Sequence, residues 1–289
     1  MFHVEPMNSS KSNKIFQATD HLVSGECFDV YWDDVRQRAW TDVEHLESMD
    51  LYYESADYIS HHTHPHSLVQ QLYVGARTLM LNYKYALLKT HLSPKAKLLD
   101  IGCGTGSFLS FMKSKGFAVF GVENHPKAKS ICLENNLEVH SNEDDIAEAG
   151  FDLITLWHVL EHLPNPEKRI SVYKNLLKVN GLLVVAVPNF ESHDRNHYQE
   201  DWAALDVPRH LWHFTSTGLI SAVEKMGFEL VKIRTLGFDV FYVCYLSEKQ
   251  RGKSFSLFRG ILKGAFFSLK ALFTKKHSSR VFVFRKRSL

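Results

Sequence analysis

Between residues 97 and 189 the sequence alternates short apolar runs with stretches that have the spacing of amphipathic helices. The expected strands, with two later candidates, lie at 97–102, 118–123, 137–141, 151–157, 182–189, 228–236 and 280–286. The expected helices lie at 67–91, 106–116, 126–136, 166–181 and 216–227. Strands that alternate with helices in this way form a parallel sheet with helices on both faces. The sequence therefore predicts a doubly wound α/β fold.

The composition is that of a globular protein from a reducing compartment. With 45% hydrophobic residues in a chain of 289, an ordinary core can form. The four cysteines contain no C-x-x-C pair, which disfavours a disulfide framework and a cysteine zinc site. No run of about 18 apolar residues occurs, and the first residues lack the apolar segment of a signal peptide. We therefore expect a cytoplasmic protein.

The most specific segment is KLLDIGCGTGSFLSFM, in which an expected strand ends and a helix begins. It contains Gly102, Gly104 and Gly106, and glycines let a backbone approach a ligand closely. A nicotinamide site uses G-x-G-x-x-G, whereas the third glycine here comes one residue early. Asp100 would repel a pyrophosphate but attract an ammonium or sulfonium group. Glu123 ends the next strand, where a carboxylate can accept both ribose hydroxyls.

The segment FDLITLWHVLEHLPNP contains H-x-x-E-H, a spacing known from zinc peptidases. In those enzymes the two histidines lie one turn apart on a helix. Here His158 follows a buried strand, and two prolines come too soon for a helix to continue. We therefore expect Glu161 and His162 in a short turn after the strand. Glu161 would anchor that turn, and no metal is expected.

These segments resemble the class I S-adenosylmethionine-dependent methyltransferases. LLDIGCGTG is similar to their glycine motif, and Glu123 to their ribose-binding acid. FDLITLWHVLEHLPNP resembles the fourth-strand motif of the branch that includes quinone-biosynthesis O-methyltransferases, and DVPRHLWHFT narrows the resemblance to a bacterial subgroup. The resemblance covers about residues 68–289. It implies a Rossmann-like, seven-stranded sheet with an antiparallel last strand, and S-adenosylmethionine as the cofactor.

The resemblance also implies where the cofactor lies. The cofactor-binding residues would be Asp100, Gly102, Cys103, Gly104, Gly106, Glu123, Asn124, Asn142, Trp157 and His158. Asp100 and the glycine loop would face the methionine end of the cofactor. The residues near Asn142 and the backbone around Trp157 would hold its adenine and sulfonium regions.

Methyl transfer requires donor and acceptor to be aligned at about 3 Å, and in some cases a base that removes a proton from the acceptor. Histidine is best suited to this proton transfer near neutral pH. The candidate catalytic residues are His158, His162, His210 and His213. The last two belong to the connection at about 190–214, which we expect to cover the acceptor, because loops at this edge of such sheets bind substrates.

Residues 1–66 are expected to form an N-terminal cap, and residues 67–289 the methyltransferase domain. The segment 20–43 resembles a small zinc-binding module that precedes such domains, but its cysteine pair is missing. We therefore expect a cap without metal.

Two further features of the cap are the tract SHHTHPH and a tyrosine-rich stretch before it. Histidine tracts in loops usually bind nothing specific, so no physiological metal is expected there. Tyr52, Tyr53 and Tyr58 either close over the cofactor or form a structural aromatic cluster.

The C-terminal part is strongly basic. Residues 249–289 contain 12 of the 34 Lys and Arg and none of the 32 Asp and Glu, so the first 248 residues sum to 22 − 32 = −10. An insertion at about 249–276 is amphipathic: Arg259, Lys263 and Lys270 flank an apolar stripe formed by Phe258, Leu262, Ala265, Leu269 and Leu272. The helix either rests on an anionic membrane surface or packs on the sheet.

The function predicted from the sequence is methyl transfer to a small-molecule or lipid-linked acceptor, most simply at an oxygen. A cofactor-binding protein without catalysis is one alternative, and a nicotinamide oxidoreductase is a weaker one because of the glycine spacing and Asp100. No nucleic-acid partner is expected, since the acidic body would repel it. The oligomeric state stays open.

Overall fold

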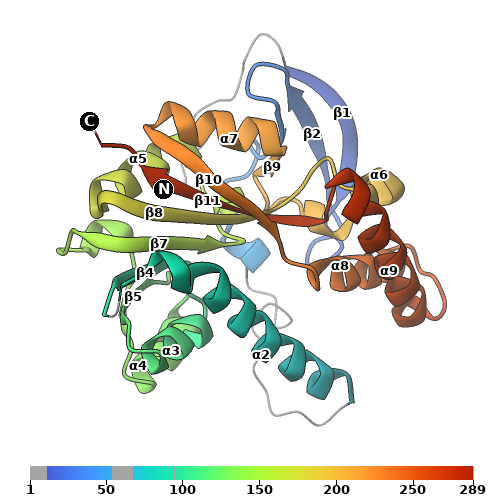
Figure 1. Ribbon diagram of the computed structural model, residues 1–289. Coiled ribbons are helices and arrows are strands. Elements are labelled where there is room, and N and C mark those ends of the chain that lie inside the picture. The colour runs from blue at the N-terminus through green and yellow to red at the C-terminus, as the bar shows by residue number, and fades with distance from the viewer. Residues whose placement is uncertain (1–11, 54–67, 94, 289) are drawn as a thin grey trace.

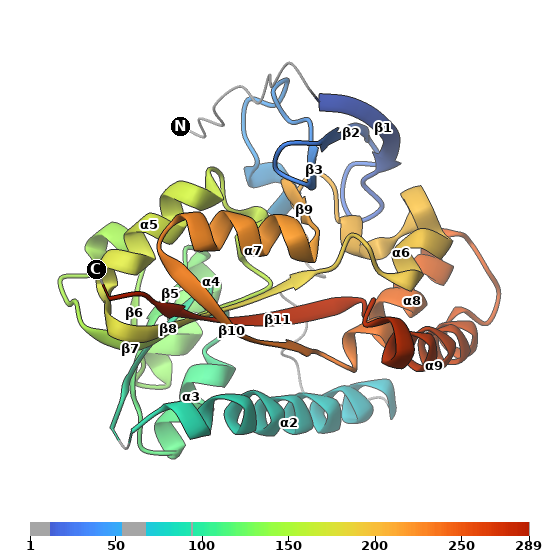
Figure 2. The ribbon, with the colours of Figure 1, turned by 45° about the horizontal axis from the view of Figure 1, so that its top comes forward.

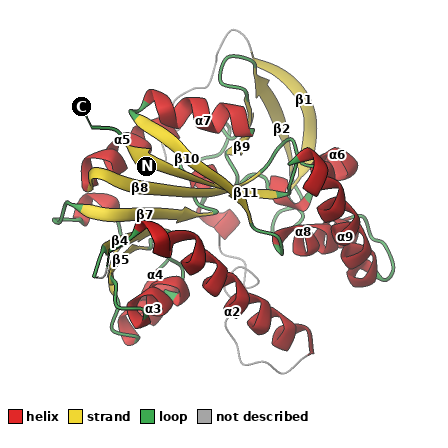
Figure 3. Ribbon diagram, in the orientation of Figure 1, coloured by secondary structure: helices red, strands yellow, loops and turns green. Residues whose placement is uncertain are grey.

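The computed structural model describes residues 12–53, 68–93 and 95–288. Strands within these segments form one sheet of seven and one of four. In Figure 1 the larger sheet crosses the middle of the molecule, and the smaller sheet lies at its top. Figure 3 shows helices on both sides of the larger sheet.

The large sheet has the strand order β10-β11-β8-β7-β4-β5-β6. Its strands are β4 (Lys97–Ile101), β5 (Ala118–Val122), β6 (Glu138–His140), β7 (Phe151–Trp157), β8 (Leu177–Pro188), β10 (Phe228–Thr235) and β11 (Ser279–Lys286). The neighbouring strands β8, β7, β4, β5 and β6 all pair in parallel. In contrast, β11 is antiparallel to both β8 and β10. This sheet confirms the predicted doubly wound fold with an antiparallel last strand.

Helices cover both faces of the sheet because successive strand residues point to opposite sides. The helices of this core are α2 (Leu68–Leu88), α3 (Ser107–Ser114), α4 (Pro126–Glu134), α5 (Pro166–Leu176), α6 (His193–Tyr198) and α7 (Ser216–Lys225). Leu98 of β4 packs in an apolar cluster with Leu109 of α3. Its neighbour Leu99 packs in the opposite cluster with Tyr173 of α5 and Leu219 of α7. Figure 2 shows α2 and α3 below the sheet and α5 and α7 above it.

Single turns of 3-10 helix join these elements. They are η1 (Asp50–Tyr53), η3 (Lys89–His91), η4 (Glu143–Asp145), η5 (Leu160–His162), η6 (Gln199–Asp201) and η7 (Ala203–Leu205).

One boundary differs from the sequence-based prediction. We expected the helix that begins at Pro166 to continue to Gly181, but α5 ends at Leu176 and β8 begins at the next residue. The register between β7 and β8 is irregular here, and Asn180 has a left-handed φ of 64°. A bulge of exposed residues therefore replaces the last turn of the expected helix, because a helix does not accommodate this backbone conformation.

The small sheet joins the N-terminal segment to a distant part of the chain. Its strands, in order, are β1 (Ser12–Thr19), β2 (Cys27–Asp33), β3 (Arg38–Thr41) and β9 (Trp212–Phe214). All of its pairs are antiparallel. Strand β9 comes from the connection after β8, so residues 12–41 and this connection build one sheet together.

A helical hairpin is inserted between β10 and β11. It consists of α8 (Asp239–Gln250), which the sequence did not predict, and α9 (Ser256–Thr274), which lies where the amphipathic helix was expected. Close contact between the two helices requires glycine: a Cβ on Gly260 would lie 2.5 Å from the Cα of Tyr245, and one on Gly264 would lie 3.0 Å from the Cα of Phe241. Among the helices of the described segments, none is long and apolar enough to cross a membrane.

Candidate active site

The glycine loop between β4 and α3 has left-handed backbone at all three predicted glycines. A Cβ on Gly102 would lie 2.6 Å from a methyl group of Val159, and one on Gly106 would lie 2.3 Å from a methyl group of Leu137. These two glycines are therefore needed for packing. At Gly104 no described atom lies within 4 Å of an added Cβ, so the loop presents an open backbone surface there. Of the three glycines of this loop, Gly104 alone has the free space that a ligand would occupy.

Two carboxylates flank the loop, as predicted. Glu123 accepts hydrogen bonds from the backbone N–H groups of Gly104, at 2.9 Å, and of His125, at 2.8 Å. Asp100 is 3% exposed and accepts a 2.5 Å hydrogen bond from the hydroxyl of Thr155. Burial raises the pKa of Asp100 to about 7. A bound cation would lower this pKa, so the site favours a positively charged ligand.

Two aromatic rings of the site, those of Trp157 and Phe108, lie beside a cation. The Nζ of Lys84, a residue of α2 that the sequence analysis did not consider, lies 4.1 Å from the ring centroid of Trp157 and 5.5 Å from that of Phe108. Burial lowers the pKa of Lys84 to about 8 although the charge of Asp100 opposes this change. The indole N–H of Trp157 is buried and has no hydrogen-bond partner within the described segments. A polar ligand could satisfy it.

The remaining predicted cofactor residues lie along the same edge of the sheet. Cys103 is buried within the loop, and burial raises the pKa of its thiol. Asn124 is exposed directly after Glu123. Asn142 is exposed at the start of η4, where its backbone N–H donates to the carboxylate of Asp145 at 3.2 Å.

The turn after β7 confirms the interpretation of H-x-x-E-H as a strand end. His158 has a left-handed φ of 57°, and Glu161 and His162 lie in η5. The ring of His158 contacts Glu161 through Nδ1, at 3.3 Å, and Asp239 through Nε2, at 3.0 Å. Burial disfavours the charged ring, but these two carboxylates outweigh it and raise the pKa of His158 to about 10. His158 is therefore an imidazolium near neutral pH and cannot act as a base in this arrangement.

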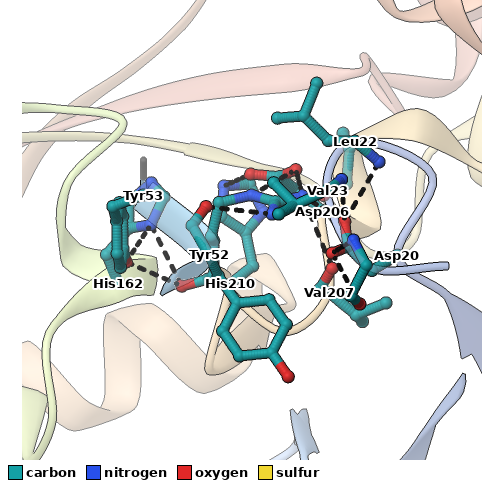
Figure 4. A network of polar contacts seen from close by, with 12 residues as sticks. Asp20, Leu22, Val23, Tyr52, Tyr53, His162, Asp206, Val207 and His210 are labelled. Atoms are coloured by element: carbon teal, nitrogen blue, oxygen red, sulfur yellow. Dashed lines mark hydrogen bonds and ion pairs between the residues drawn. The ribbon is translucent and has the colours of Figure 1, made fainter. Parts of the chain in front are cut away.

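His162 and His210 face each other, with ring centroids 4.5 Å apart. The Nδ1 of His162 lies 3.0 Å from the carbonyl of Arg209, and the Nδ1 of His210 lies 2.9 Å from the carbonyl of Ala204. Burial lowers the pKa of His162 to about 4, so its ring is neutral at pH 7. Figure 4 shows both rings together with Tyr53, whose hydroxyl lies 3.3 Å from the Nδ1 of His162.

The fourth predicted histidine lies apart from this pair. His213 is buried in β9, and its Nε2 lies 2.9 Å from the hydroxyl of Thr41, which itself donates to the carbonyl of His210. The structure thus gives His213 a hydrogen bond within the small sheet and does not bring it together with the rings of His162 and His210.

The cap is tied to the connection before β9 by Arg209, whose side chain is 1% exposed. Its guanidinium contacts Asp20 at 2.9 Å and Asp206 at 2.7 Å, as Figure 4 shows in part. Within the cap, the hydroxyl of Tyr52 donates to Glu26. Tyr58 and the histidine tract lie outside the described residues. No sequence signal links Asp20 to Arg209, or His158 to Asp239, because each pair is brought together only by the fold.

An open parallel sheet with a glycine loop after its first strand and a carboxylate after its second defines a Rossmann-like cofactor-binding domain. A family model described as a methyltransferase domain matches residues 75–233, more than half of the chain. The chain belongs to this family. The match confirms the predicted class of methyltransferase and S-adenosylmethionine as its cofactor.

Curated relatives match a smaller region. A ubiquinone biosynthesis O-methyltransferase of Glaesserella parasuis is 36% identical over 107 residues, which are 32% of this chain and 45% of the relative. One of Xanthomonas campestris pv. campestris is 33% identical over 106 residues, covering 33% and 44% of the two chains. The chain thus spans about half the length of the curated relatives it matches.

Solved structures share the fold. The magnesium protoporphyrin IX methyltransferase of Synechocystis superposes with a TM-score of 0.53 at 12% identity, covering 78% of this chain and 90% of the other. Phosphoethanolamine N-methyltransferase 2 of Haemonchus contortus superposes with a TM-score of 0.51 at 17% identity, covering 72% and 53%. At these identities the likeness concerns the fold alone.

The residues present fit S-adenosylmethionine. When bound, this cofactor supplies a methyl group on a positively charged sulfur. The open backbone at Gly104 leaves room beside the loop, and Glu123 is placed to accept hydroxyl groups at the end of β5. Asp100 and the ring of Trp157 already stabilise one cation, that of Lys84. The same groups would bind the positively charged end of the cofactor.

Proposed function

We propose that this chain transfers a methyl group from S-adenosylmethionine to an oxygen of a small-molecule or lipid-linked acceptor. The observation that carries this proposal is the adjacency of two kinds of group at the end of β7. Trp157 ends the strand, and its ring lies beside the cation of Lys84. The turn η5 follows with His162, which faces His210. Donor and acceptor groups would therefore meet at this edge of the sheet.

An oxygen acceptor suits the neutral ring of His162. A hydroxyl must lose its proton when it is methylated, and a neutral imidazole can accept that proton. The low pKa of His162 makes it a weak base, so an acidic hydroxyl such as a phenol fits better than an aliphatic alcohol. The curated relatives are named as O-methyltransferases of ubiquinone biosynthesis, which supports the same acceptor class.

A lipid-linked acceptor is favoured by α9, because the predicted apolar stripe faces solvent. Its buried residues are Gly260, Gly264, Phe267 and Ala271. The exposed apolar side chains at this helix are Phe255, Leu257, Phe258, Ile261, Leu262, Phe266, Leu269, Leu272 and Phe273. An exposed patch of this kind marks an interaction surface. The helix therefore does not pack on the sheet through its stripe.

An anionic lipid surface is the occupant that we propose for this face of α9. Lys253, Lys270, Lys275 and Lys276 are exposed around it, and residues 249–289 contain no acidic residue. Two of the cations that the sequence analysis singled out have another role, since Arg259 and Lys263 form ion pairs with Glu248 of α8 at 2.5 and 2.7 Å. The exposed lysines and the apolar stripe together resemble a helix that lies in a membrane interface.

The test of the proposed reaction is incubation of the purified chain with methyl-labelled S-adenosylmethionine and an extract of metabolites and lipids. We expect label in an O-methylated product and release of the demethylated cofactor. Asp100→Asn should abolish the transfer, because it removes the charge that holds the cofactor. Binding of the cofactor without label transfer to any component would instead support a cofactor-binding protein without catalysis.

A further inference from the structure

We propose that Glu161, His162 and His210 bind a divalent transition-metal ion. One possible ligand atom from each of these residues lies within 4.8 Å of the other two. Two of them come from the turn after β7 and the third from the connection before β9, so only the fold brings them together. This site goes beyond the proposed function. His162 can accept a proton only in the metal-free protein, because an ion bound at its Nε2 would occupy the same lone pair.

A hydrogen bond to a backbone carbonyl fixes the tautomer of each imidazole ring. The Nδ1 atom of each ring lies beside a backbone carbonyl, that of Arg209 at 3.0 Å for His162 and that of Ala204 at 2.9 Å for His210. A carbonyl only accepts, so each Nδ1 must carry the proton, and each Nε2 keeps its lone pair. Metal-binding histidines are oriented by such a hydrogen bond from their second nitrogen.

Glu161 supplies an independent observation. Its side chain is fully buried at 0% exposure, and one carboxylate oxygen, Oε1, contacts His158 at 3.3 Å. The other oxygen, Oε2, has no hydrogen-bond partner among the described residues. A buried carboxylate oxygen without a partner is costly. A metal ion between it and the two rings would satisfy all three groups at once.

The ligand set selects the kind of ion. Two imidazole nitrogens and one carboxylate suit zinc, iron, cobalt or manganese, whereas magnesium and calcium prefer oxygen ligands. Three protein ligands leave further coordination positions open, as in metal sites that bind a substrate or water. His162 is only half-buried, so the cluster is not sealed from solvent.

An ion-paired carboxylate of the same connection lies beside the cluster. The Oδ2 atom of Asp206 lies 3.9 Å from the Nε2 of His210. The other oxygen of Asp206 pairs with Arg209, which also binds Asp20 of the cap. The network of Figure 4 joins Tyr53 and His162 to the carbonyl of Arg209, and it joins the guanidinium of Arg209 to Asp206 and Asp20. The cap therefore holds the segment that supplies the third ligand.

From the sequence we expected no metal, because H-x-x-E-H is not helical here. That reason is correct for the pair His158 and His162. His158 turns to Asp239, at 3.0 Å, and does not join His162. The second histidine of the proposed site is instead His210, from the connection before β9.

The test uses Co²⁺ alone, with chelator-treated protein that carries no affinity tag and no added cofactor or acceptor. Added Co²⁺ can also bind nonspecifically to histidine tracts, so the titration is done in a variant in which the histidines at positions 61, 62, 64 and 66 are changed to serine. We expect one equivalent of Co²⁺ to bind in equilibrium dialysis. The bound ion should show the visible absorption of Co²⁺ with nitrogen and oxygen ligands. His162→Ala, His210→Ala and Glu161→Gln should each weaken binding by about 100-fold.

His193→Gln is the matched control, because this ring contacts Thr274 on α9 and not the cluster; it should bind Co²⁺ like its parent. Circular dichroism of each metal-free variant identifies any that fails to fold, and His162→Asn and His210→Asn then replace the alanine variants. The proposal is overturned if the quadruple serine variant binds no Co²⁺, or if the cluster variants bind it as tightly as the control. Since no methyl transfer is measured, failure of the proposed function would leave these results unchanged.

Discussion

At the scale of single residues, Gly104 of the cofactor loop can be compared with a glycine far from the site. Gly104 and Gly25, a residue of the cap, both have left-handed backbone, at φ 56° and 72°, and neither has a described atom within 4 Å of an added Cβ. Valine should therefore cost a similar amount of stability at each, roughly 1–2 kcal/mol.

Only Gly104→Val should also abolish the binding of S-adenosylmethionine, because its side chain would occupy the open side of the loop. Calorimetric titration of both variants measures this difference. Unchanged cofactor affinity in Gly104→Val would contradict the placement of the ligand.

The titration of Asp100 should make both the stability of the ligand-free protein and its affinity for the cofactor depend on pH. Its pKa is raised from 3.8 to about 7 by burial, so the folded, ligand-free protein holds the proton more tightly than the unfolded chain does. The resulting stability is fully present below pH 4 and is lost as the pH rises to about 7. Asp100→Asn should abolish this loss of stability at high pH. In the absence of cofactor it should raise the free energy of unfolding at pH 8 by on the order of 3 kcal/mol.

The same titration should make the wild-type protein bind S-adenosylmethionine more tightly as the pH rises from about 6 to 8, because the cation binds the ionised carboxylate. Calorimetry across this range and thermal unfolding of the variant test both effects. A pH-independent affinity would show that Asp100 does not face the positive charge.

Among the elements, the hairpin of α8 and α9 is held by one buried carboxylate. Glu248 is 0% exposed and pairs with Arg259 and Lys263. Burial opposes its ionisation, but these hydrogen bonds lower its pKa from 4.5 to about 2. Its contribution to stability is therefore present above about pH 4.5 and lost as the pH falls to about 2.

Glu248→Gln should destabilise the protein by on the order of 3 kcal/mol at pH 7, and the difference from wild type should shrink as the pH is lowered through 4. Chemical unfolding at several pH values provides the measurement. A constant difference at all pH values would mean that packing, and not the charge, is responsible.

The exposed face of α9 should bind anionic vesicles. Leu262 and Leu269 are 55% and 59% exposed, so changing both to Asp should release the protein from vesicles without lowering its stability. Leu133 of α4 is equally exposed, at 54%, and Leu133→Asp is the control that should leave vesicle binding intact.

Binding should also weaken as added salt screens the lysines. Sedimentation with vesicles at low and high salt measures both effects. Equal sedimentation of the double variant and wild type would exclude this helix as the contact.

For the whole molecule, Arg209 couples the cap to the core. It is buried between Asp20 and Asp206, and removal of one partner from a buried ion pair typically costs about 3–5 kcal/mol. Arg209→Ala should lower the free energy of unfolding by this amount and make residues 12–53 susceptible to proteolysis.

Arg36 is half-exposed and pairs with the buried Asp33, whose carboxylate also accepts hydrogen bonds from the backbone N–H groups of Val35 and Arg36. Arg36→Ala leaves these hydrogen bonds in place, so it should change stability by less than about 1 kcal/mol. Limited proteolysis and chemical unfolding compare the two. A cap that stays protected in Arg209→Ala would show that the sheet pairing of β3 with β9 is sufficient to hold it.

The sequence by itself determined the large sheet, the glycine loop and the ends of β4, β5 and β7. Each depends on local pattern: apolar runs of strand length, helices closed by glycine, and polar or aromatic residues at the end of a strand. Such patterns act over a few residues, so Asp100, Glu123 and Trp157 could be placed at one edge of the sheet before any contact was known.

Only the tertiary structure decided which distant side chains meet. His210 joins Glu161 and His162 because β9 pairs with β3 and carries its preceding connection across the end of β7. The apolar stripe of α9 was visible in the sequence, but its exposure follows from the glycines that bring the opposite face against α8. Periodicity shows that a helix has two faces, whereas the partner that covers one of them is chosen by packing across the whole chain.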